Sequence, residues 1–188
     1  SYVDRILFGK LTHPIIDKTY NMGLRPNFLT TLSFICQISS VVFLYYKKIY
    51  LFAFFYLLGY YFDCVDGPMA RKYDMVTRLG DWYDHFTDIF SFILINYLFI
   101  KKYNILDNKI ILFIYLMMFI GMLFYIGCQE RIYNKGLKVS EKSSETLFLT
   151  TYLVKDPEDL ILKIRFFCFT HFNIFVSIIP ILLTHKLC

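Results

Sequence analysis

The sequence predicts an all-α integral membrane protein, a bundle of five to six transmembrane helices preceded by an interfacial amphipathic helix. Two observations carry this prediction. Hydrophobic residues make up 57% of the 188 residues, and the mean hydropathy is +0.49, far above the average of soluble globular proteins. The apolar residues also come in long blocks, each close to the ~20 residues that a helix needs to cross a bilayer. We therefore expect residues 1–188 to form a single membrane-embedded domain.

Residues 1–24 combine regularly spaced apolar positions with basic side chains such as Arg5, Lys10 and Lys18. This pattern predicts an amphipathic helix that lies in the membrane interface, interrupted near Pro14. The sequence Arg25-Pro26-Asn27 then ends this segment and begins the next helix, because proline suits the first turn of a helix.

Five apolar blocks follow, and each predicts one transmembrane helix, at about 28–46, 49–66, 80–100, 109–128 and 164–184. Between the last two blocks, charges of both signs alternate from Gln129 to Lys163. The apolar stretch Leu147–Val154 within this region is too short to cross a bilayer unless thinning or tilt helps it. We interpret this stretch as interfacial or re-entrant, and a sixth crossing is the alternative.

The basic residues predict how the bundle is oriented. With five crossings, fourteen of the twenty Lys and Arg residues fall on the face that holds the amino-terminal segment and residues 63–88, and such an excess marks the cytoplasmic side. The net charge of +5 fits anionic lipid headgroups better than nucleic acid, because no basic cluster occurs. The cysteines lack metal-ligand spacing, and we expect reduced, mostly buried thiols at Cys36, Cys64, Cys128, Cys168 and Cys188.

The segment from Asp63 to Asp88 carries the chemistry that the sequence predicts. Asp63 and Asp66 are three residues apart, and Asp84 and Asp88 are four apart, so each pair lies on one face of a helix. Carboxylates at a membrane edge are costly unless cations neutralise them, and carboxylate oxygens suit Mg²⁺, Mn²⁺ or Ca²⁺. We expect a metal site here. The alternative is a solvated loop between two membrane helices.

The same segment resembles a known signature, D-x2-D-G-x2-A-R-x8-G-x3-D-x3-D, which marks the CDP-alcohol phosphotransferase (CDP-alcohol phosphatidyltransferase) family. All eight fixed positions and every spacing match, at Asp63, Asp66, Gly67, Ala70, Arg71, Gly80, Asp84 and Asp88. The preceding stretch Pro26–Thr30 (PNFLT) is similar to an element found ahead of the first membrane helix in this family. The resemblance covers about residues 25–128, and beyond Gln129 it is only topological.

The resemblance implies a phospholipid-synthesis transferase that moves a phosphatidyl or phosphoalcohol group from a CDP-alcohol to an acceptor hydroxyl and releases CMP. It implies Mg²⁺ or Mn²⁺ as cofactor, in a two-metal site. The implied metal ligands are Asp63, Asp66, Asp84 and Asp88. Such cations bridge pyrophosphate oxygens and stabilise the charge on the leaving nucleotide.

For the remaining signature residues, the resemblance implies contacts with the nucleotide. Gly67, Ala70 and Gly80 have little or no side chain, so the nucleotide can approach the backbone, and Arg71 is placed to meet a phosphate oxygen; a snorkelling interface arginine is the alternative. Asp88 is the family's general base. His85 is a rival, because the Asp-His pair resembles the branch that uses CDP-choline or CDP-ethanolamine.

The substrates stay open at this point. The run ARKYDMVT (70–77) resembles the branch that uses CDP-diacylglycerol, and the short chain also favours this donor; CDP-choline or CDP-ethanolamine is the alternative. The expected partners are the CDP-alcohol donor, an alcohol or lipid acceptor, the lipid bilayer and a second copy in a homodimer, without nucleic acid. Arg131, Lys135 and Lys138 could hold an anionic acceptor, or they are ordinary cytoplasmic loop residues.

Two other functions compete with this interpretation. An intramembrane prenyltransferase also binds Mg²⁺-pyrophosphate with Asp-rich motifs, and Asp81, Asp84 and Asp88 form a D-x2-D-x3-D pattern, but it leaves the glycine, alanine and arginine of the signature unexplained. A divalent-cation transporter or channel would need acidic residues near the bilayer midplane, whereas these lie toward helix ends. An inactive homologue is a third alternative, although no signature residue is missing.

Overall fold

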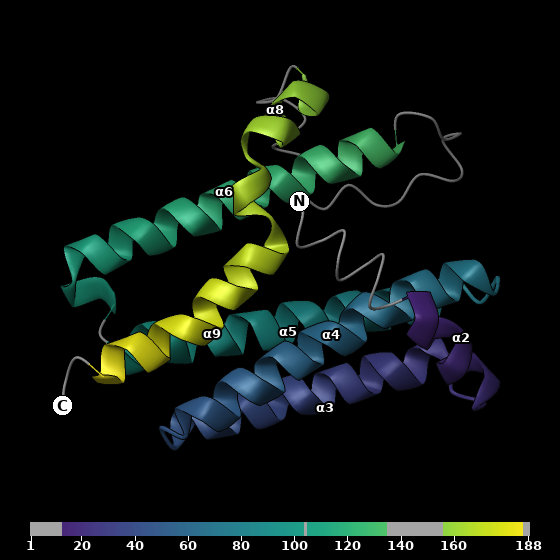
Figure 1. The fold of residues 1–188 in the computed structure, drawn as a ribbon, viewed down its shortest axis with the longest axis horizontal. Helices are drawn as coiled ribbons and strands as arrows, with labels where there is room; N and C mark the ends of the chain where they lie inside the picture. Colours follow the sequence, from purple (N-terminus) through teal and green to yellow (C-terminus); the bar gives the residue numbers. More distant parts are fainter. Residues whose placement is uncertain (1–12, 104, 135–155, 186–188) are drawn as a thin grey trace. The chain divides into compact units, whose positions relative to one another are not determined.

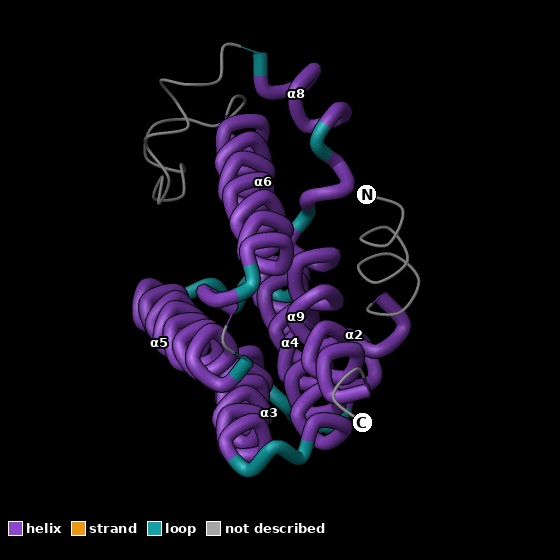
Figure 2. Tube along the Cα trace, turned by 90° about the vertical axis from the view of Figure 1, so that its left-hand side faces the viewer, coloured by secondary structure: helices purple, strands orange, loops and turns teal. Residues whose placement is uncertain are grey.

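The computed structural model describes residues 13–103, 105–134 and 156–185, and every regular element within these ranges is a helix (Figures 1 and 2). Three helices in these ranges are long and apolar enough to cross a membrane, within 26–45, 49–72 and 109–128. The predicted all-α membrane fold is therefore confirmed. The contacts group the described residues into two compact units, one made by those within 13–107 and 173–185, the other by those within 108–172.

The first unit begins with α2 (His13–Asn21) and α3 (Pro26–Tyr45). Pro14 is the second residue of α2, where its missing N–H would have no helical partner in any case, so within the described chain it does not interrupt a helix. The remainder of the predicted interfacial helix, residues 1–12, lies outside the described residues. Arg25 caps α3 and Pro26 occupies its first turn, so the predicted boundary at residues 25–27 is confirmed.

Helix α4 (Ile49–Lys72) continues beyond its predicted end. The sequence interpretation ended this helix at residue 66, where charges begin, but the helix runs six residues further with Pro68 inside it. Pro68 lies near the end of α4, where the loss of one backbone hydrogen bond is cheaper than in mid-helix. Asp63, Asp66 and Gly67 therefore all belong to one rigid helix.

Five residues separate α4 from helix α5 (Arg78–Lys102), and a short 3₁₀ helix, η2 (Ile105–Asp107), follows α5. The N-cap of α5 is Thr77, whose side chain accepts a hydrogen bond from the Gly80 N–H at 3.0 Å, which satisfies one of the free amides at the start of the helix. With 25 residues α5 is long enough to span, but it is more acidic than the three apolar helices, and its predicted crossing stays a prediction.

Helix α3 packs against both α4 and α5 (Figure 1), and small residues let α3 and α4 approach closely. A Cβ at Gly59 would lie 2.8 Å from the Gln37 Cγ atom, so only glycine fits at this crossing. The Ser33 hydroxyl donates to the Gly59 carbonyl at 2.9 Å. Nearer the acidic segment, one apolar cluster joins α2, α3 and α4 through Ile16, Leu29, Val65 and Met69.

The second unit contains α6 (Lys109–Asn134), α8 (Pro157–Lys163), the 3₁₀ helix η4 (Arg165–Phe167) and the first residues of α9 (Phe169–His185). Helix α6 packs against α8 and η4. The last membrane helix was predicted from residue 164, but η4 occupies residues 165–167 and α9 starts at Phe169. The stretch Leu147–Val154, Lys135 and Lys138 lie outside the described residues.

The prediction about cysteines is confirmed for the described part of the chain, where the thiols are buried and form no disulfide at Cys36, Cys64, Cys128 and Cys168. Cys188 lies outside the described residues.

Candidate functional site

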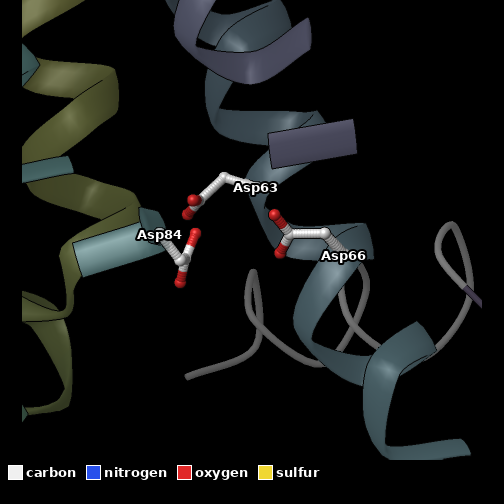
Figure 3. A group of neighbouring side chains, drawn as sticks. All are labelled: Asp63, Asp66 and Asp84. Carbon is white, nitrogen blue, oxygen red and sulfur yellow. The ribbon is translucent and has the colours of Figure 1, made fainter. Parts of the chain in front are cut away.

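The carboxylates of Asp63, Asp66 and Asp84 converge in the first unit, and we refer to them as the carboxylate cluster. Asp63 and Asp66 project from α4 toward Asp84 on α5 (Figure 3). One carboxylate oxygen of each residue lies within 4.8 Å of those of the other two. Asp66 is 4% exposed. The two halves of the acidic segment thus meet at one point.

The carboxylate cluster fits a divalent cation. None of its members forms an ion pair with a Lys or Arg of the described residues, and the Oδ1 atom of Asp84 is buried without a hydrogen-bond partner in this part of the chain. Three like charges this close, with one oxygen unsatisfied, are unfavourable unless a cation binds them. Carboxylate oxygens are the ligands that Mg²⁺ and Mn²⁺ prefer, so the donor set suits these ions.

Asp88 lies one helical turn beyond Asp84 on α5 and is half-buried. Its carboxyl group lies close enough to that of Asp63 on α4 for the two to interact electrostatically, so it borders the carboxylate cluster without belonging to it. This position suits a group that exchanges a proton with a molecule bound at the cluster.

His85 is exposed. It follows Asp84 directly, and successive residues on a helix are rotated by about 100°, so the side chains of His85 and Asp84 point in different directions. Its neighbour Phe86 is also exposed and stacks on Trp82, with ring centroids 5.6 Å apart. His85 therefore borders an aromatic surface of α5 and does not share the position of Asp88.

Arg71 and Gly67 are neighbours on the last turns of α4. A Cβ built on Gly67 would lie 3.5 Å from the Nη1 atom of Arg71, so the guanidinium group lies beside the bare backbone of Gly67. A phosphate that approached this backbone would meet the arginine, which binds phosphate oxygens well. Ala70, on the same turn, is half-buried.

Gly80 lies against another part of the protein. A Cβ on Gly80 would lie 2.9 Å from both the Oδ1 atom of Asn27 on α3 and the Oγ1 atom of Thr77. Real Cβ atoms essentially never approach other atoms so closely. The missing side chain lets the first turn of α5 pack next to α3, a contact that the sequence interpretation, which assigned Gly80 to the nucleotide, did not foresee.

Sequence reasoning also missed the role of α3 beside the carboxylate cluster. The hydroxyl of Thr30, itself 5% exposed, donates to Oδ2 of Asp66 at 2.5 Å. At the next residue of α3, the Thr31 hydroxyl lies 3.2 Å from the hydroxyl of Tyr83 on α5. The available signal was the PNFLT stretch, which ends in Thr30 and is followed by Thr31, but the sequence does not show which helices these threonines contact.

Helix α2 is tied to the end of α4 by a second polar group. The carboxylate of Asp17 accepts hydrogen bonds from Lys72 at 2.5 Å and from the Tyr73 hydroxyl at 2.6 Å. The hydrogen bond to Asp17 raises the pKa of Tyr73 to about 12, because it stabilises the protonated phenol. The ring of Tyr73 also stacks on that of Tyr20, with centroids 3.6 Å apart. These contacts fix the start of the loop between α4 and α5.

Comparison with known proteins gives one match. The family model described as CDP-alcohol phosphatidyltransferase matches residues 23–184, which include the carboxylate cluster, Asp88 and the part of α3 that contacts the cluster. Neither the curated proteins nor the solved structures contain a match to this chain.

Proposed function

Since the chain belongs to the CDP-alcohol phosphatidyltransferase family, we propose that it transfers a substituted phosphate group from a CDP-alcohol to an acceptor hydroxyl and releases CMP at the carboxylate cluster. The observation that carries this proposal is the convergence of Asp63, Asp66 and Asp84 within a segment that the family model covers. The family match favours this transferase over a prenyltransferase or a cation transporter.

In this proposal Asp63, Asp66 and Asp84 hold Mg²⁺ or Mn²⁺, as a two-metal site. When bound, a divalent cation would neutralise the negative charge of the pyrophosphate and the charge that develops on the departing CMP. The unsatisfied Oδ1 atom of Asp84 supports this assignment, because it is a buried acceptor that a cation would satisfy. The position of the cluster at the ends of α4 and α5 supports a site at the membrane interface, and the excess of basic residues supports its cytoplasmic orientation.

The donor pyrophosphate binds beside the last turns of α4. Gly67 and Ala70 allow it to approach the backbone, and Arg71, whose guanidinium lies next to Gly67, binds a phosphate oxygen. Gly80 affects nucleotide binding indirectly in this proposal, because it packs against Asn27 and so sets where the first turn of α5 lies.

Asp88 acts as the general base. The acceptor hydroxyl gives its proton to the Asp88 carboxylate while its oxygen forms a bond to phosphorus, and the bond between phosphorus and the CMP oxygen breaks. The proximity of Asp88 to Asp63 supports this choice over His85, because a base must be within reach of the reacting atoms, and His85 is exposed.

For the donor we favour CDP-diacylglycerol over CDP-choline or CDP-ethanolamine, with an alcohol as acceptor and a homodimer as the assembly. The decisive experiment supplies the purified protein in lipid nanodiscs with Mg²⁺ or Mn²⁺ and either CDP-diacylglycerol plus a panel of polar alcohols, or CDP-choline or CDP-ethanolamine plus diacylglycerol. The lipid product and CMP are then identified by mass spectrometry.

We expect a product from CDP-diacylglycerol, and EDTA should abolish its formation. A product from CDP-choline or CDP-ethanolamine alone would reverse the donor assignment and keep the reaction class. Metal uptake into proteoliposomes without CMP release from any donor would instead support the transporter and refute the transferase.

A further inference from the structure

The first two turns of α3 face both helices that carry the proposed metal ligands. Asn27, Thr30 and Thr31 are spaced i, i+3 and i+4 and therefore lie on one side of α3. Thr30 contacts Asp66 on α4, whereas the other two contact Gly80 and Tyr83 on α5. We propose that this part of α3 is a positioning element, in which the Thr30 hydroxyl holds the Asp66 carboxylate in the orientation that binds the metal. This inference rests on the proposed function.

The contact between Thr30 and Asp66 is short and buried. The oxygen atoms are 2.5 Å apart, and the two residues are 5% and 4% exposed. Hydrogen bonds from a hydroxyl to a carboxylate fall at about 2.5–2.7 Å and are roughly twice as strong as neutral ones. Because Asp66 is buried, little water competes for its carboxylate, and the Thr30 hydroxyl restrains the direction of Oδ2.

Other threonines in the described helices behave differently. Threonine hydroxyls in helices commonly donate to the carbonyl four residues earlier, as Thr19 does to Ile15 at 2.6 Å and Thr31 does to Asn27 at 2.8 Å. For Thr30 the equivalent distance, to the Pro26 carbonyl, is 3.3 Å. Its shorter hydrogen bond goes to the neighbouring helix, so the hydroxyl serves Asp66 in preference to its own backbone.

The contacts to α5 set the opposite side of the carboxylate cluster. Asn27 lies where a Gly80 side chain would be, and the Thr31 and Tyr83 hydroxyls are 3.2 Å apart. Tyr83 immediately precedes Asp84. The same two turns of α3 thus contact α4 at one metal ligand and α5 next to another, which fixes the separation between Asp66 and Asp84.

The test measures Mn²⁺ binding to the full-length protein in nanodiscs, without substrate, by electron paramagnetic resonance. Thr30→Val removes the hydroxyl and keeps the shape of the side chain, whereas Thr30→Ser keeps the hydroxyl. Residues that orient a metal ligand typically contribute 10–100-fold to metal affinity. We expect Thr30→Val to raise the Mn²⁺ dissociation constant by roughly 10-fold and Thr30→Ser to stay within about 3-fold of the wild type.

Thr19→Val is the matched control, because Thr19 is also a buried helical threonine, but it donates only to its own helix; its Mn²⁺ affinity should equal that of the wild type. Should Thr30→Val fail to fold, Thr30→Ala removes the same hydroxyl without placing a methyl group against the carboxylate. In the enzyme assay the Mn²⁺ concentration for half-maximal rate should rise, and saturating Mn²⁺ should restore most of the rate.

The outcomes separate the inference from the proposed function. If Asp66→Asn weakens Mn²⁺ binding but Thr30→Val and Thr30→Ala do not, the positioning role is refuted and the metal site stands. If Thr30→Ser is as weak as Thr30→Val, the loss comes from packing and the positioning role is refuted as well. If the wild type binds no Mn²⁺, the proposed metal site fails and the inference fails with it.

Discussion

Replacing Gly80 by alanine tests how closely α5 must approach α3. The new Cβ would lie 2.9 Å from Asn27 Oδ1 and Thr77 Oγ1. Displacing the Thr77 cap lowers the stability by about 1 kcal/mol. Overpacking against Asn27 lowers it by about 1 kcal/mol more, the lower end of the usual range, because Asn27 is exposed and its side chain can rotate. Alanine regains about 1 kcal/mol of helix propensity. The expected net loss in free energy of unfolding is about 1 kcal/mol, which lowers Tm by roughly 2–4 °C.

Intrinsic fluorescence can follow this change, because the single tryptophan of the sequence, Trp82, lies two residues after Gly80. Thermal unfolding in detergent, followed by Trp82 fluorescence, measures Tm. The rate of CMP release should fall by more than the loss of stability alone would explain, because displacing the first turn of α5 also moves Asp84. The second-site variant Asn27→Ala should recover part of the Tm loss, because it removes one of the two clashing atoms.

Gly67→Ala is the matched control. A Cβ there meets Arg71 only at 3.5 Å, an ordinary van der Waals distance, and alanine favours the helix. Its Tm should equal or exceed that of the wild type, while CMP release should fall because the methyl group occupies the proposed pyrophosphate position. A Gly80→Ala protein that unfolds at or above the wild-type temperature would refute the close approach of α5 to α3.

Further predictions concern the acidic residues. Asp63→Asn, Asp66→Asn and Asp84→Asn should each lower the rate of CMP release by about 100-fold or more, because one metal ligand is lost; near-normal turnover would remove that residue from the metal site. Asp88→Asn should abolish turnover while binding of Mn²⁺ and of CDP-alcohol, measured by calorimetry, persists. His85→Gln should cost about 10-fold or less, and a loss of about 10²–10⁴-fold would make His85 the base instead.

The sequence was sufficient to predict the helices and the placement of each aspartate pair on one face of its own helix, because hydrophobic length and helical spacing are local properties. Helix ends were less predictable. The predicted second membrane helix ended at about residue 66, yet α4 continues to Lys72 with Pro68 inside it. The packing of Val65 and Met69 against α2 and α3 outweighs the local preference of proline.

Contacts between helices could not be predicted at all. The hydrogen bond from Thr30 to Asp66 joins residues 36 positions apart, and no local pattern states which face of α3 meets α4. The close approach of Gly80 to Asn27 is of the same kind. Thr30 and Gly80 both belong to motifs that the sequence shows. Their physical roles become clear only from the packing of α3 against α4 and α5.

The fixed distance of eight residues between Arg71 and Gly80 follows from how the α4–α5 connection is anchored. Tyr73 is held by Asp17 and Tyr20 on α2, and Thr77 caps α5 at Gly80. Between these anchors only three residues, 74–76, remain, and the Met75 N–H already donates to the Ala70 carbonyl at 2.8 Å. An inserted residue taken up in the first turns of α5, between Thr77 and Asp84, would rotate the following side chains by about 100° and turn Asp84 away from Asp66. The short, anchored connection therefore favours a constant spacing between the two halves of the carboxylate cluster.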